Sequence, residues 1–336
     1  MTGKSTLKLL VSGNPRNDLA RKTGRKAIEL LKEQSIKTSI HSGFIKGKNS
    51  LPLEKVDPDI ALIFGGDGAL LHFIRGLKEK EIPVLGVNCG AKGKLMQIPH
   101  KRIDFALRNL SQKKIKKEKR TRLDSVADKK VLPTALNDVM LAPEKPAVLM
   151  RYDLFIDGEY QFRDIADGVL ISTVTGAEAY SVGLGNIIAH KDAKIFIIRP
   201  LNSLWHPNPI IVHESSKVVI DNIDCPMPVE AIVDGQERIR VKEKVSLNKS
   251  KIDAVFAFLD VELVEEKDHM KDAMPSAKYI YWMLKEKGSL TQQEIIEETG
   301  LNWRTVKRAL DFLTSHEIVS KQPLFSNRKQ KLYSIR

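Results

Sequence analysis

The chain is poor in cysteine, with only Cys89 and Cys225 among 336 residues. Two thiols cannot build a disulfide framework or, alone, a zinc site. This scarcity is typical of a reducing compartment, so we expect a cytoplasmic protein. Long hydrophobic runs are also missing, because no apolar segment approaches the roughly 20 residues that span a bilayer. We therefore expect no membrane association.

Acidic residues are outnumbered, with 42 Asp and Glu against 55 Lys and Arg, a formal net charge of +13. Such an excess suits partners that carry phosphates, whether nucleotides or nucleic acid, without choosing between them. Hydrophobic residues make up 42% and charged residues 29%, as in soluble globular proteins. The length allows two or three domains.

The segment 59–77 predicts a strand, a tight loop and a helix. Residues 60–64 form a continuous apolar run, and Gly65-Gly66-Asp67-Gly68 follows directly. Apolar residues at helical spacing come next, at Leu70, Leu71, Ile74 and Leu77. Glycines permit positive φ and close approach of a ligand, and the N-terminus of a helix attracts phosphate. Within this loop, Asp67 is placed to orient or deprotonate a hydroxyl.

Strands and helices alternate through the first 112 residues. We predict strands at 8–12 and 82–87 and helices at 19–34 and 103–110, in addition to the segment above. This alternation predicts an α/β domain with a parallel sheet, whose ligands bind at the carboxyl ends of the strands. The loops after Phe64 and Val87 should lie at that edge.

The pattern changes after residue 112. Residues 113–122 carry seven basic side chains and one acid, which predicts a solvated face or an edge strand. Residues 123–264 then form short apolar or alternating runs separated by turn residues, typical of an all-β domain. We therefore assign a β-rich domain to 113–264. Within it, residues 173–186 are too rich in glycine and polar residues for a strand and predict a loop with a short helix.

The last segment, 265–336, is predicted as a third domain. Helical patterns cover 276–287, 291–299 and 302–316, Thr291 and Glu294 form a capping box, and a hairpin follows at 318–335. The segment resembles a winged helix-turn-helix domain, a small α+β fold. Its recognition helix would begin in 302–308 and offer four residues to DNA: Arg304, Thr305, Lys307 and Arg308. Twelve Lys and Arg against seven Asp and Glu from residue 270 leave a net +5, which permits DNA binding, although such domains also serve in dimerisation or docking.

Four stretches together resemble the ATP-dependent NAD kinase family over residues 7–262. They are the glycine-rich loop at 65–68, Asn137-Asp138, the block at 166–185, and residues 233–236 (VDGQ). The resemblance implies an α/β domain followed by a β-rich domain with the active site between them. It also implies transfer of the γ-phosphate of ATP to the 2′-hydroxyl of the adenosine ribose of NAD. Magnesium would arrive with ATP, since we find no carboxylate cluster for a standing metal site, and we expect a homo-oligomer.

The resemblance also implies roles for individual residues. Asp67 would be catalytic, acting on the attacking hydroxyl. The phosphate-binding residues would be Gly65, Gly66, Gly68 and Asn88, with Arg75 as a further candidate. The dinucleotide would be bound by Asn137, Asp138, Asp167, Thr175, Ala179 and Tyr180.

The sequence departs from the family pattern mainly where the acceptor binds. Asp138 stands where the family usually has Glu, Ala177 and Glu178 replace two hydroxyl residues, and Gly183 replaces a serine. Lys94, like Lys92, interrupts a run that is usually apolar. These changes keep two alternatives open. The first is a kinase of the same fold with another hydroxyl substrate, and the second is a nucleotide-sensing transcription regulator that binds DNA through its last domain.

Overall fold

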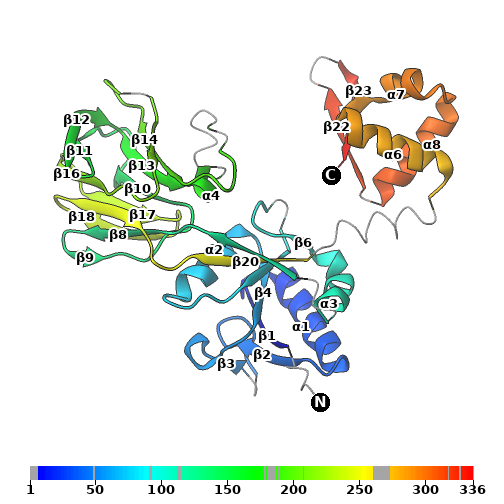
Figure 1. Cartoon of the computed structure of the whole chain (residues 1–336), viewed down its shortest axis with the longest axis horizontal. Helices are drawn as coiled ribbons and strands as arrows, with labels where there is room; N and C mark the ends of the chain where they lie inside the picture. The colour runs from blue at the N-terminus through cyan, green and yellow to red at the C-terminus, as the bar shows by residue number, and fades with distance from the viewer. Residues whose placement is uncertain are drawn as a thin grey trace. The chain divides into compact units, whose positions relative to one another are not determined.

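The computed structural model describes residues 7–47, 50–90, 93–111, 115–177, 179, 187, 189–206, 208–259, 273–316, 318–324 and 327–335. The chain forms two compact units, Met1–Leu259 and Asp260–Arg336 (Figure 1). The first unit contains both an α/β part and a β-rich part. In the described residues, no helix is both long enough and apolar enough to cross a membrane.

An eight-stranded sheet forms the α/β part of the first unit. Its order is β3-β2-β1-β4-β5-β20-β7, and β6 pairs with β5. The strands are β1 (Lys8–Gly13), β2 (Lys37–His41), β3 (Ser50–Leu51), β4 (Ile60–Gly65), β5 (Val84–Asn88), β6 (Ile98–Pro99), β7 (Ile115–Arg120) and β20 (Ala254–Leu259). The pairs among β1, β2, β4 and β5 are parallel, which confirms the predicted sheet.

Three helices cover this sheet on both faces. They are α1 (Asp18–Glu33), α2 (Asp67–Gly76) and α3 (Ile103–Ser111), and 3-10 turns lie at Leu53–Lys55 and His100–Arg102. The bounds of α1 and α3 are within two residues of the predicted limits, whereas α2 begins within the predicted loop. Alternate residues of β4 point to opposite faces. Leu62 packs in one core with α1 and α3, whereas Ile63 packs in another with α2. Of these three helices, α1 and α3 therefore share one face of the sheet, and α2, which follows the glycine-rich loop, lies on the other.

Two six-stranded sheets form the β-rich part (Figure 1). The first has the order β15-β14-β13-β10-β17-β18, with bounds β15 (Ile210–His213), β14 (Ile195–Leu201), β13 (Gly168–Thr173), β10 (Asp138–Pro143), β17 (Val229–Val233) and β18 (Glu237–Val241). The second has the order β12-β11-β16-β19-β8-β9, with bounds β12 (Glu159–Ala166), β11 (Met150–Ile156), β16 (Val218–Asp224), β19 (Val245–Lys249), β8 (Leu123–Ala127) and β9 (Lys130–Val131). One core cluster contains residues of both sheets. A short helix, α4 (Val174–Ala177), follows β13, as predicted for the glycine-rich block.

The structure differs from the sequence prediction at β20. We predict this run within the β-rich domain, but it pairs in parallel with β5 and antiparallel with β7 in the first sheet. A continuous apolar strand suits the middle of an α/β sheet, yet the run itself does not say which sheet it joins. The basic run at 113–122 supplies β7, the edge strand that we predict.

The second unit contains three helices and a small sheet. The helices are α6 (Pro275–Lys287), α7 (Gln292–Thr299) and α8 (Trp303–Ser315), and the sheet has the order β21-β23-β22, with bounds β21 (Leu290–Thr291), β23 (Asn327–Ile335) and β22 (Val319–Leu324). The capping box of Thr291 and Glu294 starts α7, and Gly300 ends it at φ 63°. These features confirm the predicted winged-helix pattern. The unit has its own buried core, which includes Ile280, Val306 and Leu310.

Candidate active site

The glycine-rich loop connects the carboxyl end of β4 to α2. Gly65 has φ 156°, and a Cβ there would lie 2.7 Å from the Cβ of Ala69. Gly66 has φ −118°, and a Cβ there would meet nothing within 4 Å. Gly65 therefore combines a positive φ with too little room for a Cβ. At Gly66 and Gly68, φ is not positive. At Gly66 the missing side chain instead leaves open space, which a ligand can use.

Asp67 lies in the first turn of α2, and both of its carboxylate oxygens are held by backbone groups. Oδ2 accepts a hydrogen bond from the Lys94 N–H at 2.9 Å, and Oδ1 accepts one from the Leu95 N–H at 3.0 Å. Gly93 permits this contact, since a Cβ at that position would lie 3.0 Å from Oδ1. Each oxygen retains a lone pair for a further donor. The loop after β5 thus fixes the direction of the carboxylate.

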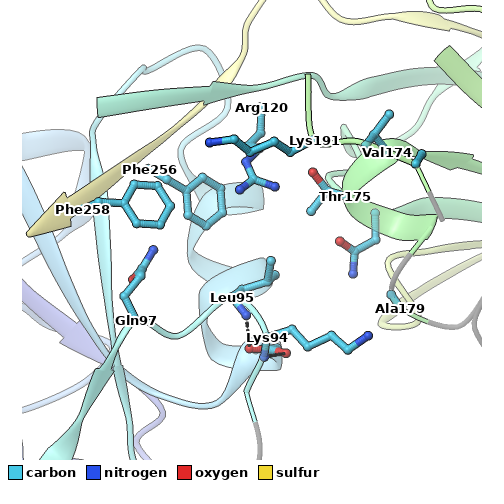
Figure 2. A pocket seen from close by; sticks show the side chains of 13 residues that line it. Lys94, Leu95, Gln97, Arg120, Val174, Thr175, Ala179, Lys191, Phe256 and Phe258 are labelled. Carbon is cyan, nitrogen blue, oxygen red and sulfur yellow. Dashed lines mark hydrogen bonds between the residues drawn. The ribbon is translucent and has the colours of Figure 1, made fainter. Parts of the chain in front are cut away.

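A pocket of about 290 Å³ lies beside Asp67. Figure 2 shows the side chains that line it, with ten of them labelled. Residues of both parts of the first unit line it: Asp67, Lys94, Leu95, Gln97, Arg120, Asn137, Val174, Thr175, Ala179, Ala189, Lys191, Phe256 and Phe258. Four of these, Asp67, Asn137, Thr175 and Ala179, are residues that the sequence predicts for the site. The fold therefore brings together groups that are more than 100 positions apart in the chain.

Asn137 lies at the turn before β10, and its side chain is 8% exposed. Its Oδ1 atom is buried and has no hydrogen-bond partner in the described part of the chain. Close packing holds its backbone, because the Thr173 N–H donates to the Asn137 carbonyl at 2.9 Å and a Cβ on Gly176 would lie 2.0 Å from that same oxygen. A buried acceptor without a donor is costly. Asn137 is therefore suited to accept a hydrogen bond from a ligand.

A buried carboxylate pair lies behind this turn. Asp234 accepts backbone N–H bonds from Leu136, at 3.1 Å, and from Asn137, at 2.7 Å. Asp138 is also buried, and burial first, then the charge of Asp234, raises its pKa to about 7. Burial also raises the pKa of Asp234, although these backbone donors oppose the rise. Among the described residues no backbone N–H donates to the Asp138 carboxylate, so Asp138 is the member of the pair that we expect to hold a proton near neutral pH.

Arg75 connects α2 to the turn between β17 and β18. Its side chain is 7% exposed. Its guanidinium donates to Gln236 Oε1 at 2.8 Å and contacts Glu237 Oε1 at 3.3 Å. Gln236 Nε2 in turn donates to the Gly68 carbonyl at 3.0 Å. Arg75 thus lies outside the pocket lining and braces the first turn of the helix, while its predicted contact with phosphate stays a prediction.

The remaining predicted residues lie in different places. Asn88 is outside the pocket lining and holds its own loop, because its Oδ1 accepts from the Gly90 N–H at 2.9 Å. Asp167 precedes β13, at the opposite end from Thr173, and accepts from Asn202 Nδ2 at 2.8 Å. Tyr180 lies outside the described residues, as do Glu178 and Gly183.

Sequence reasoning missed several lining residues, among them Gln97, Arg120, Lys191, Phe256 and Phe258. Arg120 and the two phenylalanines come from β7 and β20, strands whose sheet partners the sequence does not reveal. Arg120 did carry a signal, because β7 alternates and places Lys116, Glu118 and Arg120 on one face.

The predicted DNA-contacting residues lie on α8. Arg304, Lys307 and Arg308 are exposed and Thr305 is half-buried, whereas Val306, Ala309 and Leu310 are buried in the core of the second unit. Trp303 is 54% exposed, and the Lys307 ammonium lies 4.9 Å from the centre of its ring. One face of the helix is therefore basic and accessible within this unit.

Metal-binding potential is limited among the described residues, which contain no group of three or more His, Cys, Asp and Glu side chains able to hold an ion. Asp67 is the one acid in the described lining of the pocket. A single carboxylate fits a magnesium ion that is held mostly by phosphate oxygens and water.

Family comparisons cover most of the chain. Residues 4–115 match the ATP-NAD kinase N-terminal domain, and residues 136–258 match the ATP-NAD kinase C-terminal domain. Residues 279–320 match a winged helix-turn-helix DNA-binding family.

The chain is also similar to individual NAD kinases. The chain is 35% identical to the NAD kinase of Methanopyrus kandleri over 193 residues, 57% of this chain and 70% of that protein. It is 32% identical to the NAD kinase of Methanothermobacter thermautotrophicus over 210 residues, 62% of this chain and 74% of that one. An NAD kinase from Archaeoglobus fulgidus, solved with ATP, shares the fold with a TM-score of 0.63 and 21% identity, covering 77% of this chain and 96% of its own. Yeast NADH kinase, solved with NADH, gives a TM-score of 0.67 at 21% identity, with 80% and 89% covered.

Proposed function

The chain belongs to the ATP-NAD kinase family, and we propose that its pocket transfers the γ-phosphate of ATP to the 2′-hydroxyl of the adenosine ribose of NAD, giving NADP. The observation that supports this most is the meeting of Asp67 with Asn137 and Thr175 in one pocket. A plain turn would not need a carboxylate anchored through both oxygens. A kinase needs such an anchored group to direct the hydroxyl of its acceptor.

Asp67 would accept a hydrogen bond from the attacking hydroxyl and take its proton as the new O–P bond forms. The bond from the γ-phosphorus to the β–γ bridging oxygen would break in the same step, and ADP would leave. Phosphoryl transfer depends mostly on positioning and on stabilisation of charge, so few reactive side chains are required. The two backbone donors from Lys94 and Leu95 restrict the rotation of the carboxylate. Magnesium bound to ATP would neutralise phosphate charge, and Asp67 is the one carboxylate in the described lining that it could meet.

The acceptor would lie against the side of the pocket formed by the turn before β10 and by α4. The unpartnered Oδ1 of Asn137 would accept a hydrogen bond from the ligand. Other members of the acceptor set in our proposal are Asp138, Asp167, Thr175, Ala179 and Tyr180. The phosphate set is Gly65, Gly66, Gly68, Arg75 and Asn88.

The test is NADP formation from NAD and Mg-ATP by the purified chain, measured with an NADP-specific dehydrogenase. We expect turnover, and we expect Asp67→Asn to lower kcat by at least about 100-fold because it removes a proton acceptor. Asp59→Asn, an exposed carboxylate at the opposite end of β4 from the loop, is the matched control. Turnover by Asp67→Asn at the rate of the control would contradict the role of Asp67.

We also propose DNA binding as a second function, through the exposed basic face of α8. The exposed side chains of Arg304, Lys307 and Arg308 and the family match of residues 279–320 support it. Fluorescence anisotropy with duplex DNA should show binding that weakens with salt and that Arg304→Ala and Lys307→Ala each reduce. Binding unchanged by both substitutions, with and without ATP or NAD, would leave the second unit a docking or dimerisation module.

A homo-oligomer in the cytoplasm completes the proposal. Leu204, Trp205 and Ile211 are 61%, 56% and 54% exposed, and Ile211 lies on the edge strand β15. An unpaired edge with exposed apolar residues favours association with a second copy. Sedimentation analysis should show that Trp205→Glu lowers the oligomeric mass, and an oligomer of unchanged mass would place the interface elsewhere.

A further inference from the structure

Two cations lie together on one side of the pocket. Figure 2 shows Arg120 and Lys191 beside Phe256, while Lys94 and Leu95 lie on another side. We infer that Arg120 and Lys191 form the subsite for the phosphate chain of the bound nucleotide. The ligand group is a pyrophosphate, which ATP and NAD both contain, so this inference rests on the proposed function.

Arg120 is held in a defined orientation. Its guanidinium carbon lies 5.5 Å from the centre of the Phe256 ring, and its side chain is 21% exposed. The Phe258 ring stacks beside the Phe256 ring, with 6.4 Å between the two ring centres. A guanidinium packed on an aromatic ring keeps its planar fork of donors in place, and that fork matches two phosphate oxygens. Arg120 is therefore ready to bind phosphate without a large loss of side-chain entropy.

Positive charges outnumber negative charges around Arg120. Glu118 contacts three cations: its carboxylate lies 2.8 Å from Lys191 Nζ, 3.6 Å from Arg120 Nη2 and 3.5 Å from Lys116 Nζ. The hydrogen bond from Lys191 is the main reason that the pKa of Glu118 is lowered. One carboxylate thus faces three positive charges. The cluster keeps a net charge near +2, which an incoming pyrophosphate would neutralise.

The two ends of the pocket suit the two ends of a nucleotide. Asp67 accepts the hydroxyl that is phosphorylated, whereas Arg120 and Lys191 attract the phosphate chain. The rings of Phe256 and Phe258 give that side of the pocket an apolar lining, and a lower local dielectric strengthens the attraction between charges. Asp67 is the one acid in the described lining, and Glu118, which pairs with Lys191 and Arg120, lies outside that lining.

The test is isothermal titration of wild-type chain, Arg120→Gln and Lys191→Gln with four probes: inorganic pyrophosphate, ATP, NAD and adenosine. Each substitution should weaken binding of pyrophosphate about 10- to 100-fold, as expected for one hydrogen-bonded charge, and leave adenosine binding unchanged. Weakening of ATP alone assigns the subsite to the donor, and weakening of NAD alone assigns it to the acceptor. Wild-type affinity of both variants for pyrophosphate, ATP and NAD would overturn the inference.

Matched variants separate charge from fold. Lys117→Gln removes one exposed charge from the other face of β7 and should bind every probe like the wild type. Arg120→Lys keeps the charge but not the fork and should lie between Arg120→Gln and the wild type. Thermal unfolding of each variant checks that the fold is intact. If the wild type makes no NADP but Arg120→Gln still weakens pyrophosphate binding, the proposed function fails and the subsite stands. If NADP forms with unchanged KM in both Gln variants, the subsite fails and the kinase stands.

Discussion

Asp67 illustrates how a short motif becomes a site. The sequence places a carboxylate among glycines at the start of a helix, and the structure adds the two backbone donors of Lys94 and Leu95 that fix its direction. Those donors come from the loop after β5, the neighbouring strand. A carboxylate held in this way loses little freedom when a hydroxyl binds, which is how preorganisation contributes to catalysis.

Gly66 provides a residue-level test of ligand approach. Because a Cβ at Gly66 meets no protein atom within 4 Å and φ is ordinary, Gly66→Ala should change Tm by no more than ~2 °C. We expect its KM for ATP to rise several-fold, since the methyl group would occupy the space in front of the loop. The control is Gly47→Ala, where a Cβ also meets nothing within 4 Å. Equal KM values for the two variants would mean that no ligand approaches Gly66.

Asp138 predicts a pH dependence of stability. Its pKa is raised to about 7 in the fold, above the ~3.9 of an unfolded chain. A raised pKa favours the protonated form in the fold, so this contribution is fully present below about pH 4 and is lost as pH rises through about 7. Asp138→Asn should remove that loss and, at pH 8, stabilise the fold by of order 1 to 4 kcal/mol relative to the wild type.

Urea unfolding of the wild type and Asp138→Asn between pH 4 and 8 provides the measurement. The difference in the free energy of unfolding should grow in favour of the variant from pH 5 to 8. A difference that stays constant over this range would show that Asp138 does not titrate there. Asp128→Asn is a useful contrast, since three backbone donors help to lower the pKa of the Asp128 carboxylate.

Residues that form motifs could be found in the sequence, whereas residues that act through the topology could not. Asp67 and Asn137 stand in recognisable local patterns. Arg120 shows only the alternation of a basic edge strand and Lys191 lies in a polar loop, so their meeting in one pocket depends on which strands pair. Gly176 lies between these cases, since the sequence shows the glycine but not that it packs against the carbonyl of Asn137.

At the scale of elements, helix α2 is held by the sheet on one side and by the β17–β18 turn at its N-terminus. Its apolar face packs on the sheet, and Gln236 from the β17–β18 turn donates to the carbonyl of Gly68. Arg75 supports Gln236 from the last turn of the same helix. The turn of the β-rich part therefore helps to fix the loop that carries Asp67.

Gln236→Ala tests this contact. The substitution removes the donor to Gly68 and the acceptor for Arg75, so we expect kcat to fall about 10-fold and Tm to fall by a few degrees, as for the loss of about 1 kcal/mol. Arg240→Ala is the control, because Arg240 is exposed on the same hairpin and pairs with Glu144 at the surface. Unchanged kcat in Gln236→Ala would mean that packing on the sheet alone fixes α2.

Element types were predictable, but membership in sheets was only partly so. Period-3.6 patterns give α1, α3 and α8 to within two residues, since each helix buries one face. The predicted sheet of β20 was wrong, because a fully apolar strand fits the inside of either sheet. It lies next to the basic edge strand β7, which is 134 positions earlier at their first paired residues, Ala254 and Arg120.

At the scale of the whole molecule, the two units have separate cores. The pocket is lined by residues of the first unit alone. We therefore predict that a chain ending at Leu259 folds and retains kinase activity, with kcat within about threefold of the full chain. Circular dichroism and the NADP assay measure both properties. Loss of cooperative unfolding in the shortened chain would show that the second unit belongs to the folding core of the first.

The central claim is the transfer of phosphate to the 2′-hydroxyl of the adenosine ribose, and phosphorus NMR of the product tests it most directly. The purified chain is incubated with NAD and Mg-ATP, and the dinucleotide product is isolated. We predict one new phosphomonoester resonance that matches authentic NADP and is absent with Asp67→Asn. A resonance from a phosphate on another hydroxyl, or an unchanged dinucleotide after complete incubation, would contradict it.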